Sequence, residues 1–341
     1  MKTIIAVPDF TRKAHLKTIL PPLLKKLKGQ DVEIIIATGL HRTPTKKEIK
    51  DNIGQPHNLA GCRTATCEVN VHNYRKRSVA YFGKTKTGVP IYLNKKLKNA
   101  DSIITVGVVE PHLYAGYSGG TKVVAIGLAG EKTINATHHP RFLDKPGTRI
   151  CSIKNNPFRR FIEEVSNLLP ITYSINIVNT NPPKIFKGAP RASFKKATSY
   201  CKKIYEKKDN KKLGVIICDT PREKSINIYQ ASRTFNYTTN IKKNGIILVK
   251  ADLKEGFGKG LGEKRFMKKM LNMKNPKKLI ADIKKKGCLA GEHRAYMVAK
   301  AMLNARLGFI SKNARLYKNK PLPFLFFKNM KEAQSFIRNR G

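Results

Sequence analysis

Three short runs rich in isoleucine and valine limit the folds open to this chain of 341 residues. They span residues 2–7, 32–37 and 102–106, and the segment 15–28 between the first two has the composition of a helix. Short, continuous apolar runs separated by helical stretches are typical of buried parallel strands joined by crossover helices. The pattern therefore predicts an α/β fold with a mostly parallel, Rossmann-like sheet.

A second α/β domain is expected in the C-terminal part of the chain. Further apolar runs at 213–218 and 245–250 predict strands, and a polar, lysine-rich run at 207–212 precedes them. With 40% hydrophobic residues, a chain of this length can form two cores. We expect an N-terminal cofactor-binding domain at 1–207, a C-terminal substrate-side domain at 208–341, and an active-site cleft between them.

Polar side chains follow each of the three N-terminal runs. Asp9 and Arg12 come after the first run, His41 after the second, and Glu110 and His112 after the third. In open, parallel α/β sheets, ligands bind outside the carboxyl ends of the strands. The sequence therefore predicts that these side chains share one site.

The segment after the third run carries further candidate binding residues, which are Ser118, Gly119, Gly120 and Lys122. Glycines let a backbone come close to a ligand, and the N-terminus of a helix favours an anion. The amine of Lys122 could contact a phosphate or form a covalent tether. The alternative interpretation is a glycine-rich turn with ordinary polar side chains.

The histidines suggest proton transfer and metal binding. His41 and His112 can give or take a proton near neutral pH, because the ordinary pKa of imidazole lies there. The neighbouring His138 and His139 could supply a ligand to nickel, zinc, copper or iron. Two adjacent side chains of a helix point in different directions, so at most one of this pair is expected to bind a metal.

The net charge of +46 raises the question of a nucleic-acid partner. Lysines are scattered along the chain instead of forming one basic arm, and no nucleic-acid-binding motif is found. We therefore expect no specific nucleic-acid partner, and only weak, salt-sensitive binding of polyanions. A non-catalytic nucleotide- or polyanion-binding α/β protein is the alternative function.

The sequence gives no sign of a membrane or an oxidising environment. No apolar run approaches the roughly 18 residues of a spanning helix, and the N-terminus lacks the features of a signal peptide. The six cysteines form no C-x-x-C pair, which speaks against a zinc ribbon or a disulfide framework. A cytoplasmic protein with reduced cysteines is expected.

Several of these segments together resemble the nickel-dependent lactate racemases and their wider group of 2-hydroxyacid racemases and epimerases. Four motifs match, and a fifth is weaker. They are Asp9-Phe-Thr-Arg12, Gly39-Leu-His41-Arg42, the segment from Glu110-Pro-His112 to Gly119-Gly120-Thr-Lys122, His138 sixteen residues later, and Tyr229-Gln230-Ala-Ser-Arg233.

The resemblance implies a racemase or epimerase of a small 2-hydroxy acid that uses a nickel pincer nucleotide. It implies His41 and His112 as catalytic residues and His138 as the nickel ligand. It assigns the nucleotide to Asp9, Arg12, Ser118, Gly119, Gly120 and Lys122, with Lys122 as the tether, and the substrate to Gln230 and Arg233. Arg233 stands where the family commonly has lysine, so the preferred substrate is left open.

The resemblance also implies partners. These are the hydroxy acid itself and the proteins that make the cofactor. The oligomeric state, the identity of the hydroxy acid and the lasting attachment of the cofactor remain open.

Overall fold

The computed structural model describes residues 1–54, 67–206, 211–237 and 240–339. Its contacts divide the chain into two compact units. The first comprises Met1–Thr137 and Phe142–Glu206, and the second comprises His138–Arg141 and Lys207–Gly341. The domain boundary expected between residues 207 and 208 lies outside the described residues.

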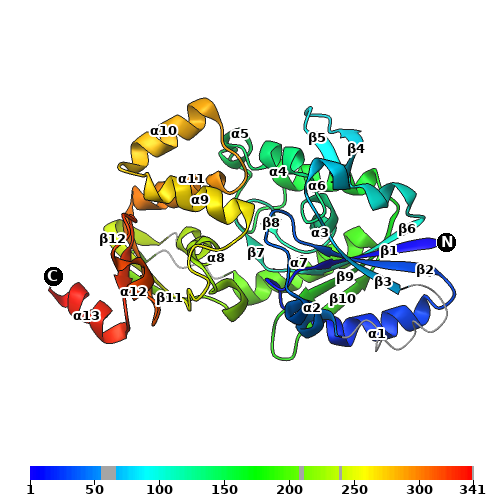
Figure 1. Cartoon of the computed structure of the whole chain (residues 1–341), viewed down its shortest axis with the longest axis horizontal. Helices are drawn as coiled ribbons and strands as arrows, with labels where there is room; N and C mark the ends of the chain where they lie inside the picture. Colours follow the sequence, from blue (N-terminus) through cyan, green and yellow to red (C-terminus); the bar gives the residue numbers. More distant parts are fainter. Residues whose placement is uncertain (55–66, 207–210, 238–239, 340–341) are drawn as a thin grey trace. The chain divides into compact units, whose positions relative to one another are not determined.

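A six-stranded sheet forms the centre of the first unit (Figure 1). Its strand order is β10-β9-β6-β1-β2-β3, and all neighbours are parallel except β9 and β10. The strands are β1 (Lys2–Pro8), β2 (Asp31–Ala37), β3 (Cys67–Val71), β6 (Ser102–Val108), β9 (Ile171–Val178) and β10 (Lys184–Gly188). The mostly parallel sheet predicted from the sequence is confirmed.

The three strands that precede the candidate residues are immediate neighbours. Strand β1 lies between β6 and β2, with Ala6 opposite Thr105 and Pro8 opposite Ala37. Because all three run in the same direction, their carboxyl ends meet at one edge of the sheet. The turns that follow them are therefore close in space although they are far apart in the chain.

Helices cover both faces of this sheet (Figure 1). On one face, α1 (Leu16–Lys26) and α2 (Lys46–Ile53) contribute Leu20 and Ile53 to a core with Ile5 and Ile34. On the other face lie α3 (Lys122–Ala125), α6 (Pro157–Asn167) and α7 (Pro190–Tyr205). Proline occupies the first position of α6 and α7, where its missing N–H costs no hydrogen bond.

Smaller elements complete the first unit. Two antiparallel hairpins pair β4 (Val79–Lys84) with β5 (Pro90–Asn94) and β7 (Pro111–His112) with β8 (Gly116–Tyr117). The short helix α4 (Glu131–Thr137) follows α3, and the next short helix, α5 (Pro140–Leu143), begins in the segment His138–Arg141 that belongs to the second unit. The β7–β8 hairpin carries the candidate residue His112.

The second unit is built on a fully parallel sheet in the order β11-β12-β13-β14. Helices α9 and α11 pack on one face through residues such as Phe266 and Val298, and α13 packs on the other through Ala333. The strands are β11 (Leu213–Asp219), β12 (Ile241–Lys250), β13 (Ala305–Ile310) and β14 (Leu325–Phe327). The helices are α8 (Ile228–Ala231), α9 (Leu261–Leu271), α10 (Pro276–Lys286), α11 (Glu292–Met302), α12 (Arg315–Lys318) and α13 (Met330–Arg338). The prediction of a second α/β unit is confirmed.

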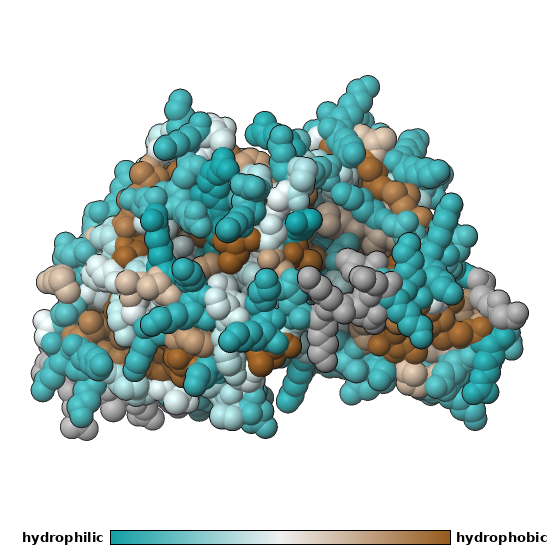
Figure 2. All heavy atoms as spheres, turned by 180° about the vertical axis from the view of Figure 1, so that it is seen from behind, coloured by the Kyte–Doolittle hydropathy of each residue, from teal (hydrophilic) through white to brown (hydrophobic). Residues whose placement is uncertain are grey.

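Hydrophilic side chains are spread over the surface seen in Figure 2 and are not gathered into one stripe. This distribution agrees with the scattered lysines of the sequence. Among the described residues, none of the helices combines the length and the apolar character needed to cross a membrane.

Candidate active site

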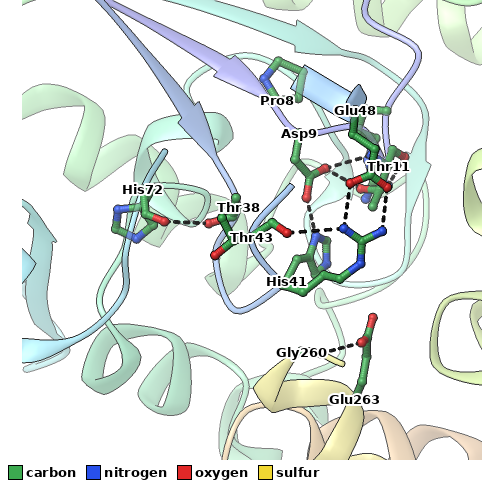
Figure 3. A network of polar contacts seen from close by, with 12 residues as sticks. Pro8, Asp9, Thr11, Thr38, His41, Thr43, Glu48, His72, Gly260 and Glu263 are labelled. Atoms are coloured by element: carbon green, nitrogen blue, oxygen red, sulfur yellow. Dashed lines mark hydrogen bonds and ion pairs between the residues drawn. The ribbon is translucent and has the colours of Figure 1, made fainter. Parts of the chain in front are cut away.

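A carboxylate and an imidazole meet at the edge of the first sheet (Figure 3). Asp9 follows β1 and is 3% exposed, and its Oδ2 lies 2.7 Å from Nδ1 of His41, which follows β2. The other carboxylate oxygen, Oδ1, accepts hydrogen bonds from the backbone N–H and the hydroxyl of Thr11, at 3.1 and 2.6 Å. Both carboxylate oxygens are therefore used to hold this turn together.

The charge state of Asp9 determines the proton position on His41. Burial alone would raise the pKa of Asp9, but His41, Thr11 and Arg12 outweigh it and hold the pKa below its ordinary value. An ionised carboxylate only accepts hydrogen bonds, so Nδ1 of His41 donates. The neutral ring of His41 then carries its lone pair on Nε2.

The turn of His41 is braced by its neighbour Arg42. The two terminal nitrogens of the guanidinium bind the two carboxylate oxygens of Glu48 at 2.7 and 2.6 Å (Figure 3). Glu48 also completes a capping box with Thr45 at the start of α2. On its other side the guanidinium lies 4.4 Å from the centre of the Phe10 ring. These contacts connect the turn after β2 to the turn after β1.

Arg12 and Glu110 link the ends of β1 and β6. The Nε of Arg12 lies 3.6 Å from a carboxylate oxygen of Glu110, and both side chains are largely buried. Ser118 holds the backbone beside Glu110, because its hydroxyl donates to Val108 O at 2.7 Å and accepts from the Glu110 N–H at 3.1 Å. The structure thus brings together Asp9, Arg12, His41 and Glu110, as the strand order predicts.

His112 is held by the backbone of its own hairpin. Its Nδ1 accepts hydrogen bonds from the backbone N–H groups of Tyr114 and Ala115, each at 3.2 Å, and the ring is 8% exposed. The rings of Tyr114 and Phe158 lie 5.7 and 6.4 Å away, centre to centre. A backbone N–H can only donate, so the neutral ring of His112 carries its proton on Nε2.

Arg159 holds the β7–β8 hairpin in place, and no sequence pattern predicts this role. This side chain of α6 is 3% exposed and donates to the carbonyl oxygens of Ala115 and Tyr117. Burial lowers the pKa of Arg159 to about 10. The buried guanidinium thus supplies hydrogen bonds to backbone carbonyl oxygens of the short β7–β8 hairpin.

The glycines near Lys122 are required by the packing of the chain itself. Gly116 has φ +73°, and a Cβ there would lie 2.0 Å from the Ser152 carbonyl oxygen. A Cβ on Gly119 would lie 2.4 Å from Val109 Cγ2, and the Gly120 N–H donates to Asn176 Oδ1 at 2.7 Å. Lys122 begins the single-turn helix α3 and is partly buried. The predicted cofactor contacts of Ser118, Gly119, Gly120 and Lys122 stay predictions.

The remaining candidate residues belong to the second unit. The His138 ring lies 4.6 Å from that of His293, centre to centre, and both are buried. Burial, together with the positive fields of His138, Arg294 and Arg233, holds the pKa of His293 well below its ordinary value. Gln230 lies on α8 and is 1% exposed. Arg233 lies on the following 3₁₀ helix, η5 (Ser232–Asn236). No sequence pattern identifies His293, which lies beside His138, or its neighbour Arg294.

The adjacent residues His138 and His139 differ in how far their side chains are buried. His138 is buried, whereas His139 is partly exposed and its Nδ1 accepts from the backbone N–H of Arg141 at 3.2 Å. In the described part of the chain, no three His, Cys, Asp or Glu side chains are grouped in a way that could hold a metal ion by themselves. The predicted metal-binding role of His138 stays a prediction.

His72 is a further buried histidine, but its surroundings are those of a structural residue. Its Nε2 donates to Ala129 O at 3.0 Å, and its Nδ1 lies 3.2 Å from the amide nitrogen of Asn94, which donates to it. Burial lowers the pKa of His72 to about 4. Both ring nitrogens of His72 have hydrogen-bond partners in the first unit, so the ring stays neutral. It can therefore be compared with the rings of His41 and His112.

Comparison with known proteins finds similarity to lactate racemases. A family model described as the lactate racemase N-terminal domain matches residues 1–150. The lactate racemase of Thermoanaerobacterium thermosaccharolyticum is 27% identical over 330 residues, which cover 93% of this chain and 75% of that protein. The lactate racemase of Lactiplantibacillus plantarum is 28% identical over 272 residues, covering 75% of this chain and 61% of that protein.

Solved structures give the same fold. The lactate racemase apoprotein from Thermoanaerobacterium thermosaccharolyticum superposes with a TM-score of 0.83 at 24% identity, covering 99% of this chain and 82% of that one. A protein from Thermotoga maritima superposes with a TM-score of 0.73 at 16% identity, covering 95% of this chain and 87% of that one. Residues 1–150 thus match the lactate racemase N-terminal domain, and the chain as a whole is similar in sequence and fold to lactate racemases, which are isomerases.

Proposed function

We propose that this protein interconverts the enantiomers of a small 2-hydroxy acid such as lactate, with a nickel-bearing pyridinium mononucleotide as its cofactor. The observation that carries the proposal is the pair of Asp9 and His41 at the edge of the first sheet. A buried, ionised carboxylate that orients an imidazole gives that imidazole a lone pair on Nε2, and such a ring is suited to take a proton from a hydroxyl group.

The residues of the chain fit the chemistry of this cofactor. Lys122, which is partly buried, offers an amine for a tether, and Arg12 offers a planar guanidinium for a phosphate. His138 offers a buried imidazole, a ligand that nickel accepts. When bound, such a nucleotide supplies an acceptor for the α-hydrogen of the substrate and its electron pair.

Asp9 has a different role in this proposal from the one that the resemblance implies. Its two carboxylate oxygens are engaged by His41 and Thr11, so it acts by orienting the base. Ser118, Gly119 and Gly120 shape the backbone on which Lys122 is presented. Their contact with the nucleotide would be made through backbone groups.

Gln230 and Arg233 would bind the carboxylate of the substrate. A guanidinium can hold a carboxylate with two parallel hydrogen bonds, which a lysine cannot do. The net charge of +46 would raise the local concentration of an anionic substrate, and added salt would weaken this effect. Arg233 is therefore the residue most expected to shift the choice of hydroxy acid.

The test uses protein produced together with the enzymes that make the nucleotide. Enantiopure lactate, malate, phenyllactate and aldonates are supplied one at a time, and the loss of optical rotation is followed. We expect at least one of these acids to be racemised or epimerised. Protein that carries the nucleotide and changes none of them would contradict the proposed activity.

The cofactor is tested separately by intact-mass measurement. The parent protein is expected to show an added mass that the variant Lys122→Arg lacks, because arginine keeps the charge but cannot form the same tether. An unchanged mass in both proteins would remove the tether from the proposal. Tight, sequence-selective nucleic-acid binding at physiological salt would instead support the non-catalytic alternative.

A further inference from the structure

Strand β11 differs from the other edge strands of the two large sheets. An edge strand directs every second N–H and C=O group away from its neighbour, and natural edges are protected by charged side chains or by short length. In the first sheet β10 carries two lysines and β3 carries Glu68, and in the second sheet β14 has only three residues. Strand β11 has seven residues and carries no charged side chain before its last residue, Asp219. It is therefore the edge that is most open to pairing.

The side chains of β11 are exposed as expected for an open edge. Val215 and Ile217 pack against the core beneath α13, but neither is fully buried. Leu213 is 39% exposed, and no heavy atom lies within 4 Å of the position that a Cβ on Gly214 would take. Among the described strands, β11 pairs only with β12. Its outer side thus has room for another strand.

The sequence of this edge is complementary to itself. A two-fold axis perpendicular to a sheet keeps each side chain on its own face, so two copies of β11 can pair antiparallel with Val215 opposite itself. Leu213 then lies opposite Ile217 of the second copy, and Asp219 lies opposite Lys211 of the second copy. Moving the axis one residue forward would place Asp219 opposite Leu213. Moving it one residue back would place Lys211 opposite Ile217, so charged and apolar pairs favour the register centred on Val215.

We propose that two copies of this chain associate through β11, with the strands antiparallel and Val215 at the two-fold axis, so that the second sheet continues from one copy into the other. The outward backbone groups of both edges pair, and Asp219 meets Lys211 at each end of the paired strands. Asp219 can reach this contact because its side chain is 82% exposed, although its Oδ1 lies 3.4 Å from Nζ of Lys250. One strand from each copy gives a small interface, so we expect a reversible dimer that depends on protein concentration.

Sedimentation of the whole chain without nucleotide tests the association. The parent protein should change from monomer to dimer as its concentration rises. Asp219→Lys places like charges opposite each other at both ends, so we expect the dissociation constant to rise about 10-fold. The double variant Lys211→Asp with Asp219→Lys restores opposite charges and should recover the affinity of the parent.

Asp282→Lys is the matched control, because it changes the net charge by the same amount at an exposed position on α10. Its dissociation constant should equal that of the parent. A parent protein that stays monomeric at every concentration would overturn the proposal. So would equal weakening by Asp282→Lys and Asp219→Lys, or a double variant that binds no better than Asp219→Lys.

A disulfide cross-link tests the register. Only the residue on the two-fold axis lies opposite its own copy, at a Cα–Cα distance that a disulfide can span. Val215→Cys treated with diamide should therefore form a covalent dimer. The parent protein and Leu213→Cys should not, although Leu213 is the more exposed of the two positions. A cross-link through residue 213 and none through residue 215 would contradict the proposed pairing.

Discussion

His41 and His112 both follow a strand of the first sheet, yet different kinds of atoms hold their rings. The turn of His41 depends on side chains, since Asp9, Thr11 and the Arg42–Glu48 pair make its contacts. The hairpin of His112 depends on the backbone, with two N–H groups at the ring and Arg159 at the carbonyl oxygens. The first arrangement can be changed by exchanging one side chain, whereas the second changes only when the hairpin itself is displaced.

The difference shows how a fold gives one residue type two chemical properties. An acidic side chain at Nδ1 makes the ring a base at Nε2, and backbone amides at Nδ1 make it a donor there. The surrounding residues, and not the histidine itself, decide the outcome. The following changes test each arrangement in turn.

The largest effect is expected from Asp9→Asn, which breaks the His41 arrangement. An amide at this position can donate to Nδ1, so His41 would adopt the tautomer of His112 and lose its lone pair at Nε2. We expect the turnover rate of the nucleotide-loaded enzyme to fall by about 10³-fold, as general-base catalysis contributes a factor of this size. The measurement is the rate of loss of optical rotation with saturating substrate.

Asp101→Asn is the matched control for this change. Asp101 is exposed, directly precedes β6, and accepts a hydrogen bond from the backbone N–H of Lys2 at 2.7 Å. Turnover should be close to that of the parent protein. If Asp9→Asn is folded and keeps most of its activity, Asp9 does not control the tautomer of His41.

The next effect is expected from Gly116→Ala, which breaks the His112 arrangement. A Cβ at this position would lie 2.0 Å from the Ser152 carbonyl oxygen, and φ is +73°, where only glycine is unstrained. The backbone must move, so we expect the free energy of unfolding to fall by more than about 3 kcal/mol. Urea unfolding followed by circular dichroism gives this quantity.

Gly88→Ala separates the steric overlap from the backbone strain. Gly88 has φ +80°, but no heavy atom lies within 4 Å of the position that its Cβ would take. Backbone strain alone should lower the free energy of unfolding of Gly88→Ala by about 1 to 2 kcal/mol. Equal destabilisation by both variants would mean that contact with Ser152 does not determine the hairpin.

The sequence predicts the elements of the sheet better than it predicts the atoms of the site. Strands β1, β2 and β6 are buried on both faces and read as continuous Ile and Val runs, so their positions and the meeting of Asp9 with His41 follow from the pattern. Strand β13 is not predicted, because Arg306 and Gly308 interrupt its apolar run and a helix directly precedes it.

The missing parts of the site depend on contacts between distant segments. Arg159 reaches carbonyl groups more than 40 positions earlier in the chain, and His72 contacts Ala129. Neither contact leaves a local pattern, because any buried arginine or histidine would look the same in the sequence. The glycines of the Glu110–Lys122 segment suggest an approach by a ligand, but tight packing of the chain on itself explains them.

His72 is a further buried imidazole, and its pKa makes the stability of the protein depend on pH. His72 has the tautomer of His112, and burial lowers its pKa from 6.5 to about 4. Between these values the unfolded chain binds a proton that the folded protein does not, so stability falls as pH falls through this window. We expect a loss of about 3 kcal/mol from this group, complete near pH 4.

The matched variant is His72→Gln, whose amide N–H can still donate to Ala129 O. It cannot take up a proton in this range, so its free energy of unfolding should depend less on pH between 6.5 and 4 than that of the parent protein. Urea unfolding at several pH values gives both slopes. Identical slopes would show that His72 does not contribute.

The smallest effect is expected from Arg42→Lys, which loosens the His41 turn without removing its charge. Lysine cannot hold both oxygens of Glu48 or lie flat on Phe10, but the ion pair is partly exposed, so we expect a loss of about 1 kcal/mol or less. Arg191→Lys is the control, since its guanidinium makes one exposed hydrogen bond, to Asn167. Thermal unfolding measures stability, and the ¹⁵N signals of His41 report its tautomer. Because Asp9 and not Arg42 contacts the ring, the Nδ1–H signal should persist in Arg42→Lys, and its loss would show that the tautomer depends on the whole turn.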